Sequence, residues 1–132
     1  MTEPNWVSAK VALAIHSAQL AEHGGADGVR DIGLLESALA RPQHLYAFGQ
    51  PDLAEMTAAY AFGIARNHPF ADGNKRTAFV VCLLFLAKNG LDLIADDVEC
   101  IRTFWALAAG EVAEPDLATW IRANSASRTS PK

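Results

Sequence analysis

The sequence has little cysteine, no long apolar run and no excess of basic residues. Its two cysteines, Cys82 and Cys100, form neither a disulfide framework nor a CxxC metal pattern, which is typical of a reducing compartment. The longest uncharged apolar stretch, residues 77–87, is far shorter than the roughly 18 residues that cross a bilayer. Eleven lysines and arginines against fifteen acidic residues give a net charge of −4, so the overall field does not attract nucleic acid. We therefore expect a cytoplasmic protein that binds neither a membrane nor nucleic acid directly.

The chain is long enough for one compact domain and too short for two. Its 132 residues are 51% hydrophobic, and a chain of this size buries roughly two thirds of its unfolded surface. The last residues are polar and finish in Ser-Pro-Lys. We therefore predict one domain over residues 1–124 and a disordered tail over residues 125–132.

Apolar spacing and capping residues predict an all-α fold of about six helices, with no convincing strand. The spacing favours a first helix over residues 7–23. Asp31 can cap a short second helix that ends near Pro42, because proline disfavours helical geometry in the residue before it. Residues 43–51 are then a surface loop or a small hairpin. Asp52 and Glu55 have the spacing of a capping box that opens a helix over residues 52–67, and Asp96 and Glu99 repeat it for a helix over residues 96–110. Further helices are expected over residues 74–89 and from about residue 115 onward, where Pro115 stands near the first turn. The helix over residues 74–89 is apolar on nearly every side, which predicts that it is the buried central helix.

The segment HPFADGNKR, residues 68–76, carries the most chemistry. It leads into the apolar helix, whose first amides have no intrahelical partner and lie at the positive end of the helix dipole. Lys75 and Arg76 add two cations within the first turn, where they oppose the dipole unless an anion binds there. Gly73 leaves the backbone open to such an anion. The pattern predicts a phosphate site at the start of this helix.

His68 and Asp72 add the groups that a phosphoryl transfer needs. Asp72, beside a cationic pocket, can hold Mg²⁺, which binds one or two carboxylates together with phosphate oxygens. His68 is suited to accept a proton from a hydroxyl near neutral pH. Each residue alone has a plainer interpretation: Asp72-Gly73-Asn74 as a turn, Asn74 as a helix cap, and His68-Pro69 as a helix end. Their combination at one helix start favours a functional site.

This segment resembles the central motif of the Fic/Doc superfamily, HxFx(D/E)GNxR. It matches the motif at His68, Phe70, Asp72, Gly73, Asn74 and Arg76. Residues 24–42, with Gly24-Gly25, GVRD and Arg41-Pro42, are similar to the N-terminal half of death-on-curing (Doc) toxins. The resemblance implies a compact helical domain that transfers part of a nucleoside triphosphate to a protein hydroxyl. It implies His68 as the general base, Asp72 as the Mg²⁺ ligand, Gly73, Asn74, Lys75 and Arg76 as the cradle for the phosphates of ATP, and Phe70 as the anchor of the motif in the core.

The motif departs from the adenylylating pattern GNGRxxR at two positions. Lys75 stands where that pattern has its second glycine, and Phe79 stands where it has its second arginine. Doc-type members have the GNKR form. For them the resemblance implies a kinase that binds ATP in the reversed sense and phosphorylates a threonine of elongation factor Tu, which arrests translation. A Fic-type adenylyltransferase and a catalytically idle partner-binding module are the alternatives.

The resemblance also implies how such a toxin is controlled. Doc toxins are neutralised by a small Phd-like antitoxin whose C-terminal segment folds as a helix in a groove on the toxin. Many Fic enzymes instead carry an inhibitory (S/T)xxxE(G/N) motif, which this sequence lacks. Residues 43–50 correspond to the family's substrate-aligning flap, with an ordinary loop as the alternative. Arg30-Asp31 is predicted to be a structural pair or a cap, and His16 and His23 lack the further ligands of a metal site.

Overall fold

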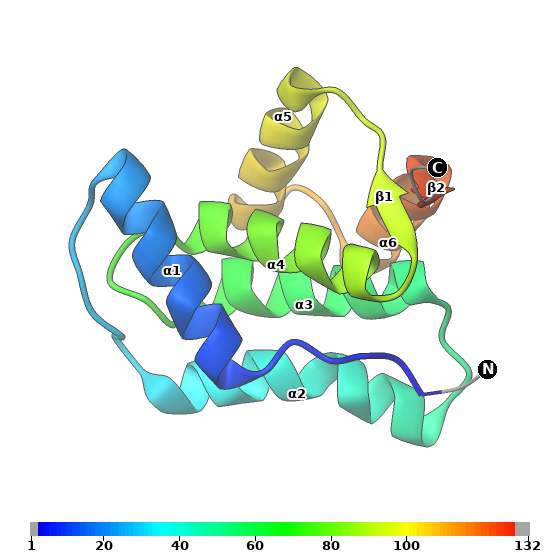
Figure 1. Cartoon of the computed structure of the whole chain (residues 1–132), viewed down its shortest axis with the longest axis horizontal. Helices are drawn as coiled ribbons and strands as arrows, with labels where there is room; N and C mark the ends of the chain where they lie inside the picture. Colours follow the sequence, from blue (N-terminus) through cyan, green and yellow to red (C-terminus); the bar gives the residue numbers. More distant parts are fainter. Residues whose placement is uncertain (1–2, 129–132) are drawn as a thin grey trace.

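The computed structural model describes residues 3–128, which form six helices and one small two-stranded sheet (Figure 1). The helices are α1 (Ala9–His23), α2 (Ile32–Phe48), α3 (Leu53–Asn67), α4 (Asn74–Lys88), α5 (Asp97–Ala108) and α6 (Glu114–Ala123). The strands β1 (Leu91–Leu93) and β2 (Ser125–Ser127) pair antiparallel, with Asp92 opposite Ala126. The predicted all-α class is confirmed, and the short sheet is an addition that the sequence did not indicate.

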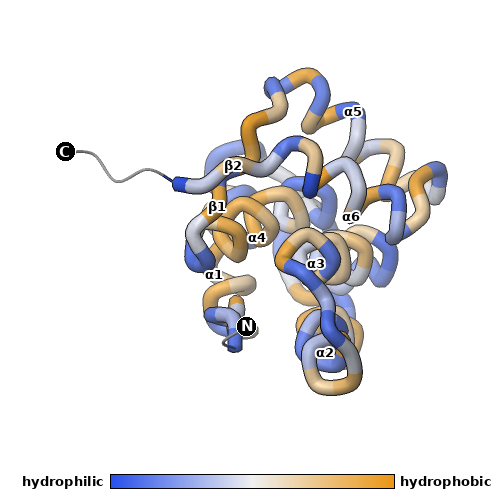
Figure 2. The backbone as a smooth tube through the Cα atoms, turned by 90° about the vertical axis from the view of Figure 1, so that its right-hand side faces the viewer, coloured by the Kyte–Doolittle hydropathy of each residue, from blue (hydrophilic) through white to orange (hydrophobic). Residues whose placement is uncertain are grey.

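The central helix is α3 and not α4. Ten of the 15 residues of α3 are buried, against seven of the 15 in α4. α3 packs against α2, α4, α5 and α6, and it lies between α2 and α4 in Figure 1. Its many alanines allow these neighbours to approach from several sides. Much of the tube of α4 has a hydrophobic colour in Figure 2, but side chains such as Phe79 and Leu84 are only half-buried. The prediction that the helix over residues 74–89 would be central is therefore wrong.

α2 continues through Pro42 to Phe48. Pro42 is buried on the same face as Leu35, Ala38 and Leu39, and this face packs against α3. A Cβ on Gly63 of α3 would lie 3.0 Å from Ala38, so the two helices cross at close range. Burial of this face offsets the roughly 3 kcal/mol that a proline inside a helix costs. The predicted helix end near Pro42, and the loop, hairpin or flap over residues 43–50, are therefore wrong for the helical residues 43–48.

α3 and α5 each begin with a side chain that caps the N-terminus of the helix. Asp52 accepts a hydrogen bond from the Glu55 amide at 2.8 Å, and the Glu55 carboxylate accepts one from the Asp52 amide at 3.0 Å. This confirms the predicted capping box. The same spacing at Asp96 and Glu99 forms only half of a box, because the Glu99 carboxylate instead accepts a hydrogen bond from the Trp120 indole at 2.9 Å. That contact joins α5 to α6.

The C-terminal part of the described chain belongs to the fold. Ser125–Ser127 form β2, and the Arg128 amide donates to the Gly90 carbonyl at 2.9 Å. The predicted disordered tail over residues 125–132 is therefore wrong for residues 125–127, and residues 129–132 lie outside the described residues. Among the residues that the structure describes, no helix is both long enough and apolar enough to cross a membrane.

Candidate active site

The motif residues line one cavity of about 560 Å³ at the N-terminal end of α4, which we call the motif pocket. The motif contributes Ala71 and six predicted site residues to its surface, His68, Asp72, Gly73, Asn74, Lys75 and Arg76. Trp105 and Ala108 of α5 and Ala109, the residue that follows this helix, complete the lining. Six of the seven predicted site residues thus share one cavity. The seventh, Phe70, lies behind it in the core with 1% of its surface exposed.

α4 begins with three backbone amides that precede its first intrahelical hydrogen bond. Gly73 is the residue before the helix, and its φ of 78° lies in the left-handed region that favours glycine. The first bond of the helix runs from the Thr77 amide to the Gly73 carbonyl at 3.0 Å. The amides of Asn74, Lys75 and Arg76 come before it and have no partner within the helix. They are the donors that an anion in the motif pocket would meet.

The side chain of Asn74 closes the motif loop. Its amide nitrogen donates to the Phe70 carbonyl at 3.0 Å, and its oxygen accepts from the Phe70 amide at 3.0 Å. Asn74 is buried, and it is the first residue of the helix and not its cap. The plainer interpretation of Asn74 as the cap of this helix is therefore wrong. Because its side chain is committed to Phe70, Asn74 offers its backbone amide to the motif pocket.

His16 of α1 supports the motif from behind. Its ring stacks on Phe70 with the ring centroids 3.8 Å apart and the planes 7° from parallel. Its Nε2 donates to the Asp72 carbonyl at 2.8 Å, which requires the proton on Nε2. Metal binding was the role that the sequence suggested for His16, because nothing in the sequence marks a contact between residues 56 positions apart. Among the described residues there is no cluster of three or more His, Cys, Asp or Glu that could hold a metal.

The Asp72 carboxylate faces the connection between α1 and α2. Its Oδ1 accepts from the Gly73 amide at 2.8 Å, and its Oδ2 accepts a longer bond from the Ala26 amide at 3.4 Å. A Cβ on Gly25 would lie only 2.7 Å from Oδ2, so this approach requires glycine there. Asp72 is exposed, and each of its oxygens has a second lone pair. The carboxylate can therefore also bind a cation.

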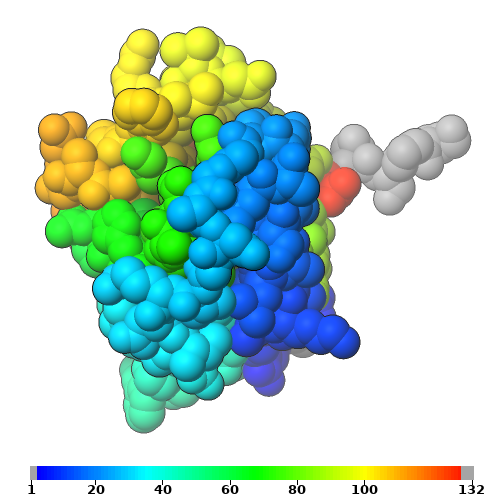
Figure 3. All heavy atoms as spheres, turned by 90° about the vertical axis from the view of Figure 1, so that its left-hand side faces the viewer, coloured from blue at the N-terminus to red at the C-terminus, as the bar shows by residue number. Residues whose placement is uncertain are grey.

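The connection between α1 and α2 lies across the motif loop (Figure 3). The Ala71 amide donates to the Gly28 carbonyl at 3.0 Å, and the Arg30 amide donates to the Pro69 carbonyl at 2.7 Å. Asp31 ends this connection by capping α2, where it accepts from the Leu34 amide at 3.1 Å. The backbone of the motif loop is thus held from both sides, by α1 and by this connection.

Arg30 fixes the backbone of His68. Its Nε donates to the His68 carbonyl at 2.7 Å, and its Nη2 donates to the Asn67 carbonyl at 2.8 Å. These two carbonyls lie at the C-terminal end of α3, which is the negative end of its helix dipole. The positive charge of Arg30 is therefore also favourable there. His68 has a φ of 51°, which is unusual for a residue other than glycine, and its exposed side chain reaches the motif pocket. Arg30 is therefore a positioning residue, a role that the predicted structural pair with Asp31 did not include.

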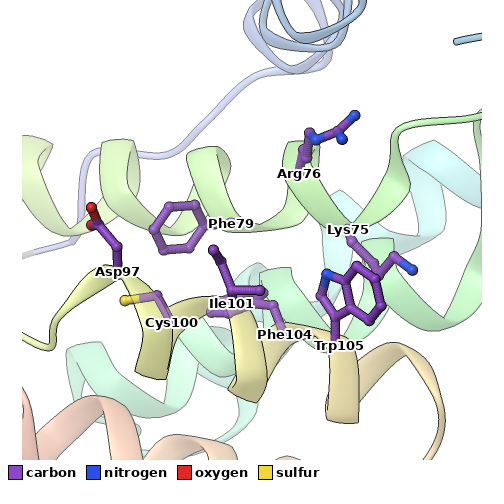
Figure 4. Close-up of a pocket in the computed structure, with 8 residues that line it drawn as sticks. All are labelled: Lys75, Arg76, Phe79, Asp97, Cys100, Ile101, Phe104 and Trp105. Carbon is purple, nitrogen blue, oxygen red and sulfur yellow. The ribbon is translucent and has the colours of Figure 1, made fainter. Parts of the chain in front are cut away.

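Lys75 and Phe79 both lie toward α5. The Lys75 ammonium sits 4.4 Å from the centre of the Trp105 ring, a cation–π contact of about 0.5–1 kcal/mol at an exposed site. Figure 4 shows the Lys75 side chain against this indole, whereas the Arg76 side chain extends in a different direction. Phe79 meets Phe104 edge to face at 5.2 Å. The position at which the adenylylating pattern has its second arginine is therefore an apolar contact between α4 and α5.

α5 carries a row of exposed apolar side chains, Val98, Ile101 and Trp105, which we call the α5 stripe. Each of them has more than half of its surface exposed, and they recur at helical spacing. The stripe borders an apolar groove between α4 and α5 that also contains Cys100 (Figure 4). Burial and, to a lesser extent, nearby acidic residues raise the pKa of the Cys100 thiol. This thiol stays protonated at neutral pH and is a poor nucleophile.

Two kinds of comparison with known proteins bear on this site. The profile of the Fic/DOC family matches residues 6–86, which include the whole motif. A protein of Escherichia phage P1 named protein kinase doc is 35% identical over 117 residues, which cover 88% of this chain and 92% of that protein. A protein of Mycolicibacterium smegmatis named toxin Doc is 48% identical over 75 residues, which cover 55% of this chain and 58% of that protein.

Proposed function

The chain belongs to the Fic/DOC family, and from that membership we propose that it is a toxin kinase. It transfers the γ-phosphate of ATP to a hydroxyl of a translation protein. The family resemblance implies that this hydroxyl belongs to a threonine of elongation factor Tu. The names of the two relatives, a protein kinase and a toxin, support this function. The observation that carries the proposal is the motif pocket, in which an imidazole, a carboxylate and the amides at the start of α4 share one cavity.

The start of α4 binds the phosphates. The amides of Asn74, Lys75 and Arg76 point their dipoles toward an anion, and the Lys75 and Arg76 side chains add positive charge. Gly73 supplies the left-handed backbone conformation from which α4 begins, and this conformation sets the direction of these amides. Without an anion these two cations would weaken the helix, because they lie at the positive end of its dipole.

Asp72 fits a magnesium ion that arrives with the nucleotide. Mg²⁺ commonly binds through one or two carboxylates together with substrate phosphates, and Asp72 is an exposed carboxylate beside the amides of α4. When bound, the ion would neutralise charge that develops on the phosphate oxygens. The backbone contacts of Asp72 with Gly73 and Ala26 hold the carboxylate in place for this role.

His68 accepts the proton of the attacking hydroxyl. In the transfer, the substrate oxygen forms a bond to the γ-phosphorus, the bond from that phosphorus to the departing ADP oxygen breaks, and the hydroxyl proton passes to the imidazole. The geometry supports this role because the side chain reaches the motif pocket while its backbone is held by Arg30. Imidazole is also the side chain best suited to proton transfer at neutral pH.

Two residues favour transfer of the γ-phosphate over transfer of AMP. Lys75 fills the space that glycine leaves open in the adenylylating pattern. Phe79 packs on Phe104 where that pattern has an arginine to hold further phosphates. The motif pocket thus lacks two of the features with which an adenylyltransferase binds the α- and β-phosphates.

The α5 stripe is the surface that we assign to the neutralising partner. Val98, Ile101 and Trp105 present apolar side chains at helical spacing, and the groove beside them is apolar as well. A helix with an apolar face buries such a row well. The proposed occupant is the C-terminal helix of a Phd-like antitoxin, which would lie next to the motif pocket because Trp105 lines both.

Labelled ATP tests the proposed reaction. The purified chain is incubated with Mg²⁺, a bacterial lysate and ATP labelled at either the γ- or the α-phosphate, without antitoxin. We expect transfer of the γ-label only, and its loss in Asp72→Ala and in His68→Ala, because general base catalysis is typically worth about 10²- to 10⁴-fold. His44→Ala is the matched control, since His44 is exposed on α2 and does not line the motif pocket.

Growth experiments test the same proposal in cells. Expression of the chain should arrest bacterial growth, and His68→Ala should not. Coexpression of the antitoxin should restore growth, whereas Ile101→Asp, which places a charge in the α5 stripe, should resist this rescue. Transfer of the α-label alone, or equal toxicity of His68→Ala and the unchanged protein, would show that the kinase assignment is wrong.

A further inference from the structure

Trp105 joins the motif pocket to the α5 stripe. Trp105 is 63% exposed, and it lines the motif pocket together with Ala108, the last residue of α5, and Ala109, which follows it. The opposite side of the pocket is formed by the motif, with its charged and polar groups. The motif pocket therefore has one wall suited to phosphates and one wall made of an aromatic ring and two methyl groups.

We propose that Trp105 is the stacking platform for the base of the nucleoside triphosphate, a subsite that rests on the proposed function. With the phosphates at the amides of α4, the nucleoside must extend from that point along the pocket. The wall formed by α5 offers it a flat aromatic face, and the small side chains of Ala108 and Ala109 leave room beside the indole. Bases stack on such rings irrespective of their identity, because every base has a π-face.

Lys75 links this subsite to the phosphates. In the structure its ammonium covers the Trp105 ring at 4.4 Å (Figure 4). The side chain is long and flexible, and its backbone amide belongs to the phosphate-binding start of α4. A bound phosphate attracts the ammonium more strongly than the ring does, because it carries a full negative charge. Phosphate binding therefore uncovers the indole face on which the base then stacks.

The α5 wall also determines which bases are accepted. Its three side chains carry one polar atom, the indole nitrogen of Trp105, so they have little means to read the hydrogen-bonding edge of a base. A site that recognises a base by stacking tolerates different purines. The ligand class is therefore a nucleoside triphosphate without strict base selection, with ATP and GTP bound at similar affinity.

Calorimetric titration of the antitoxin-free protein tests the subsite. The ligands are ATP, GTP and inorganic tripolyphosphate, each with Mg²⁺, and the proteins are the unchanged chain, Trp105→Ala, Trp105→Phe and Trp120→Phe. We expect ATP and GTP to bind the unchanged chain with dissociation constants within about threefold of each other. Trp105→Ala should weaken both by roughly 5- to 100-fold without weakening tripolyphosphate binding, because the variant loses the base contact and keeps every phosphate contact.

Two variants complete the test. Trp105→Phe should restore most of the affinity, because phenylalanine keeps an aromatic face. Trp120→Phe, on α6 and outside the motif pocket, should behave as the unchanged chain, and quenching of tryptophan emission by ATP should persist in Trp120→Phe but vanish in Trp105→Phe.

The outcomes separate this subsite from the proposed function. If ATP binds Trp105→Ala as tightly as the unchanged chain, or if this variant also loses tripolyphosphate, Trp105 is not the base platform although the kinase proposal stands. A more than tenfold preference for ATP over GTP contradicts recognition by stacking alone. If no ligand binds the unchanged chain, both the proposed function and the subsite are wrong.

Discussion

The two ends of α3 are held by different means. At its start, Asp52 and Glu55 exchange hydrogen bonds across three residues. At its end, the carbonyls of Asn67 and His68 accept hydrogen bonds from Arg30, which is 37 and 38 residues away in the chain. The capping box at the start is complete within one turn, although Arg122 of α6 also donates to Asp52, whereas the bonds at the end form only when the connection between α1 and α2 has folded onto it.

The difference corresponds to what each end does. The start of α3 supports the helix and its contact with Arg122 of α6, and Asp52 has an ordinary extended backbone. The end of α3 places His68 in a left-handed conformation and leads directly into the motif loop. Such a conformation costs free energy, and it persists because several distant groups hold it. Variants at the end should therefore affect activity, and those at the start should affect only stability.

Among these variants, Phe70→Ala should lower the free energy of unfolding most, because it affects the motif loop that follows the end of α3. The ring is buried and stacks on His16, and truncating a buried phenylalanine typically costs about 3–5 kcal/mol of a total that is of order 5–15 kcal/mol. Thermal and urea unfolding measure the loss. Phe48→Ala is the control, because Phe48 is 88% exposed and should leave the free energy of unfolding nearly unchanged. A melting temperature of Phe70→Ala equal to that of the unchanged chain would show that this ring does not anchor the motif.

Arg30→Gln tests whether the end of α3 affects activity more than its start does. It removes the charged donors to the His68 and Asn67 carbonyls, so the imidazole loses its fixed position. A displacement of about 1 Å in a catalytic group can lower a rate by up to roughly 100-fold. We expect kcat for label transfer to fall by about 10- to 100-fold while the variant stays folded by circular dichroism.

The matched control for Arg30→Gln lies at the other end of the helix. Arg122 of α6 donates to the Asp52 carboxylate at 2.7 Å, so Arg122→Gln removes the same chemical group from the start of α3. It should leave kcat unchanged. Equal losses of kcat in both variants would mean that Arg30 stabilises the protein in general and does not position His68.

The parts of the fold that rest on local chemistry could be predicted from the sequence. The capping box at Asp52, the cap at Asp31 and the proline in the first turn of α6 each act within a few residues, and each is present. Predictions that depended on tertiary contacts were wrong. α2 passes through Pro42 because its apolar face is buried against α3, a contact that proline propensity does not contain. β2 likewise forms only because β1 lies beside it.

The candidate site shows the same division. The motif residues are contiguous in sequence, so their common location was predictable, and the structure places six of the seven predicted site residues in the motif pocket. The groups that hold or complete the site come from elsewhere: His16 from α1, Arg30 from the connection after it, and Trp105 from α5. None of the three stands at a distinctive spacing from the motif. Only the packing of the helices brings them there.

The smallest expected effect concerns the acid stability of the start of α3. The hydrogen bond from Arg122, with further bonds from the capping box, holds the pKa of Asp52 below its ordinary value of 3.8. A carboxyl whose pKa is lower in the folded state stabilises the protein above its unfolded pKa, and this stabilisation is lost as the pH falls through the folded pKa. Arg122→Gln removes the largest cause of the shift, so the free energy of unfolding should fall less steeply with acidification below about pH 4. At neutral pH the difference should be small, because exposed ion pairs contribute little. Urea unfolding between about pH 2 and pH 7 measures both slopes, and identical slopes would show that Arg122 does not stabilise the Asp52 carboxylate.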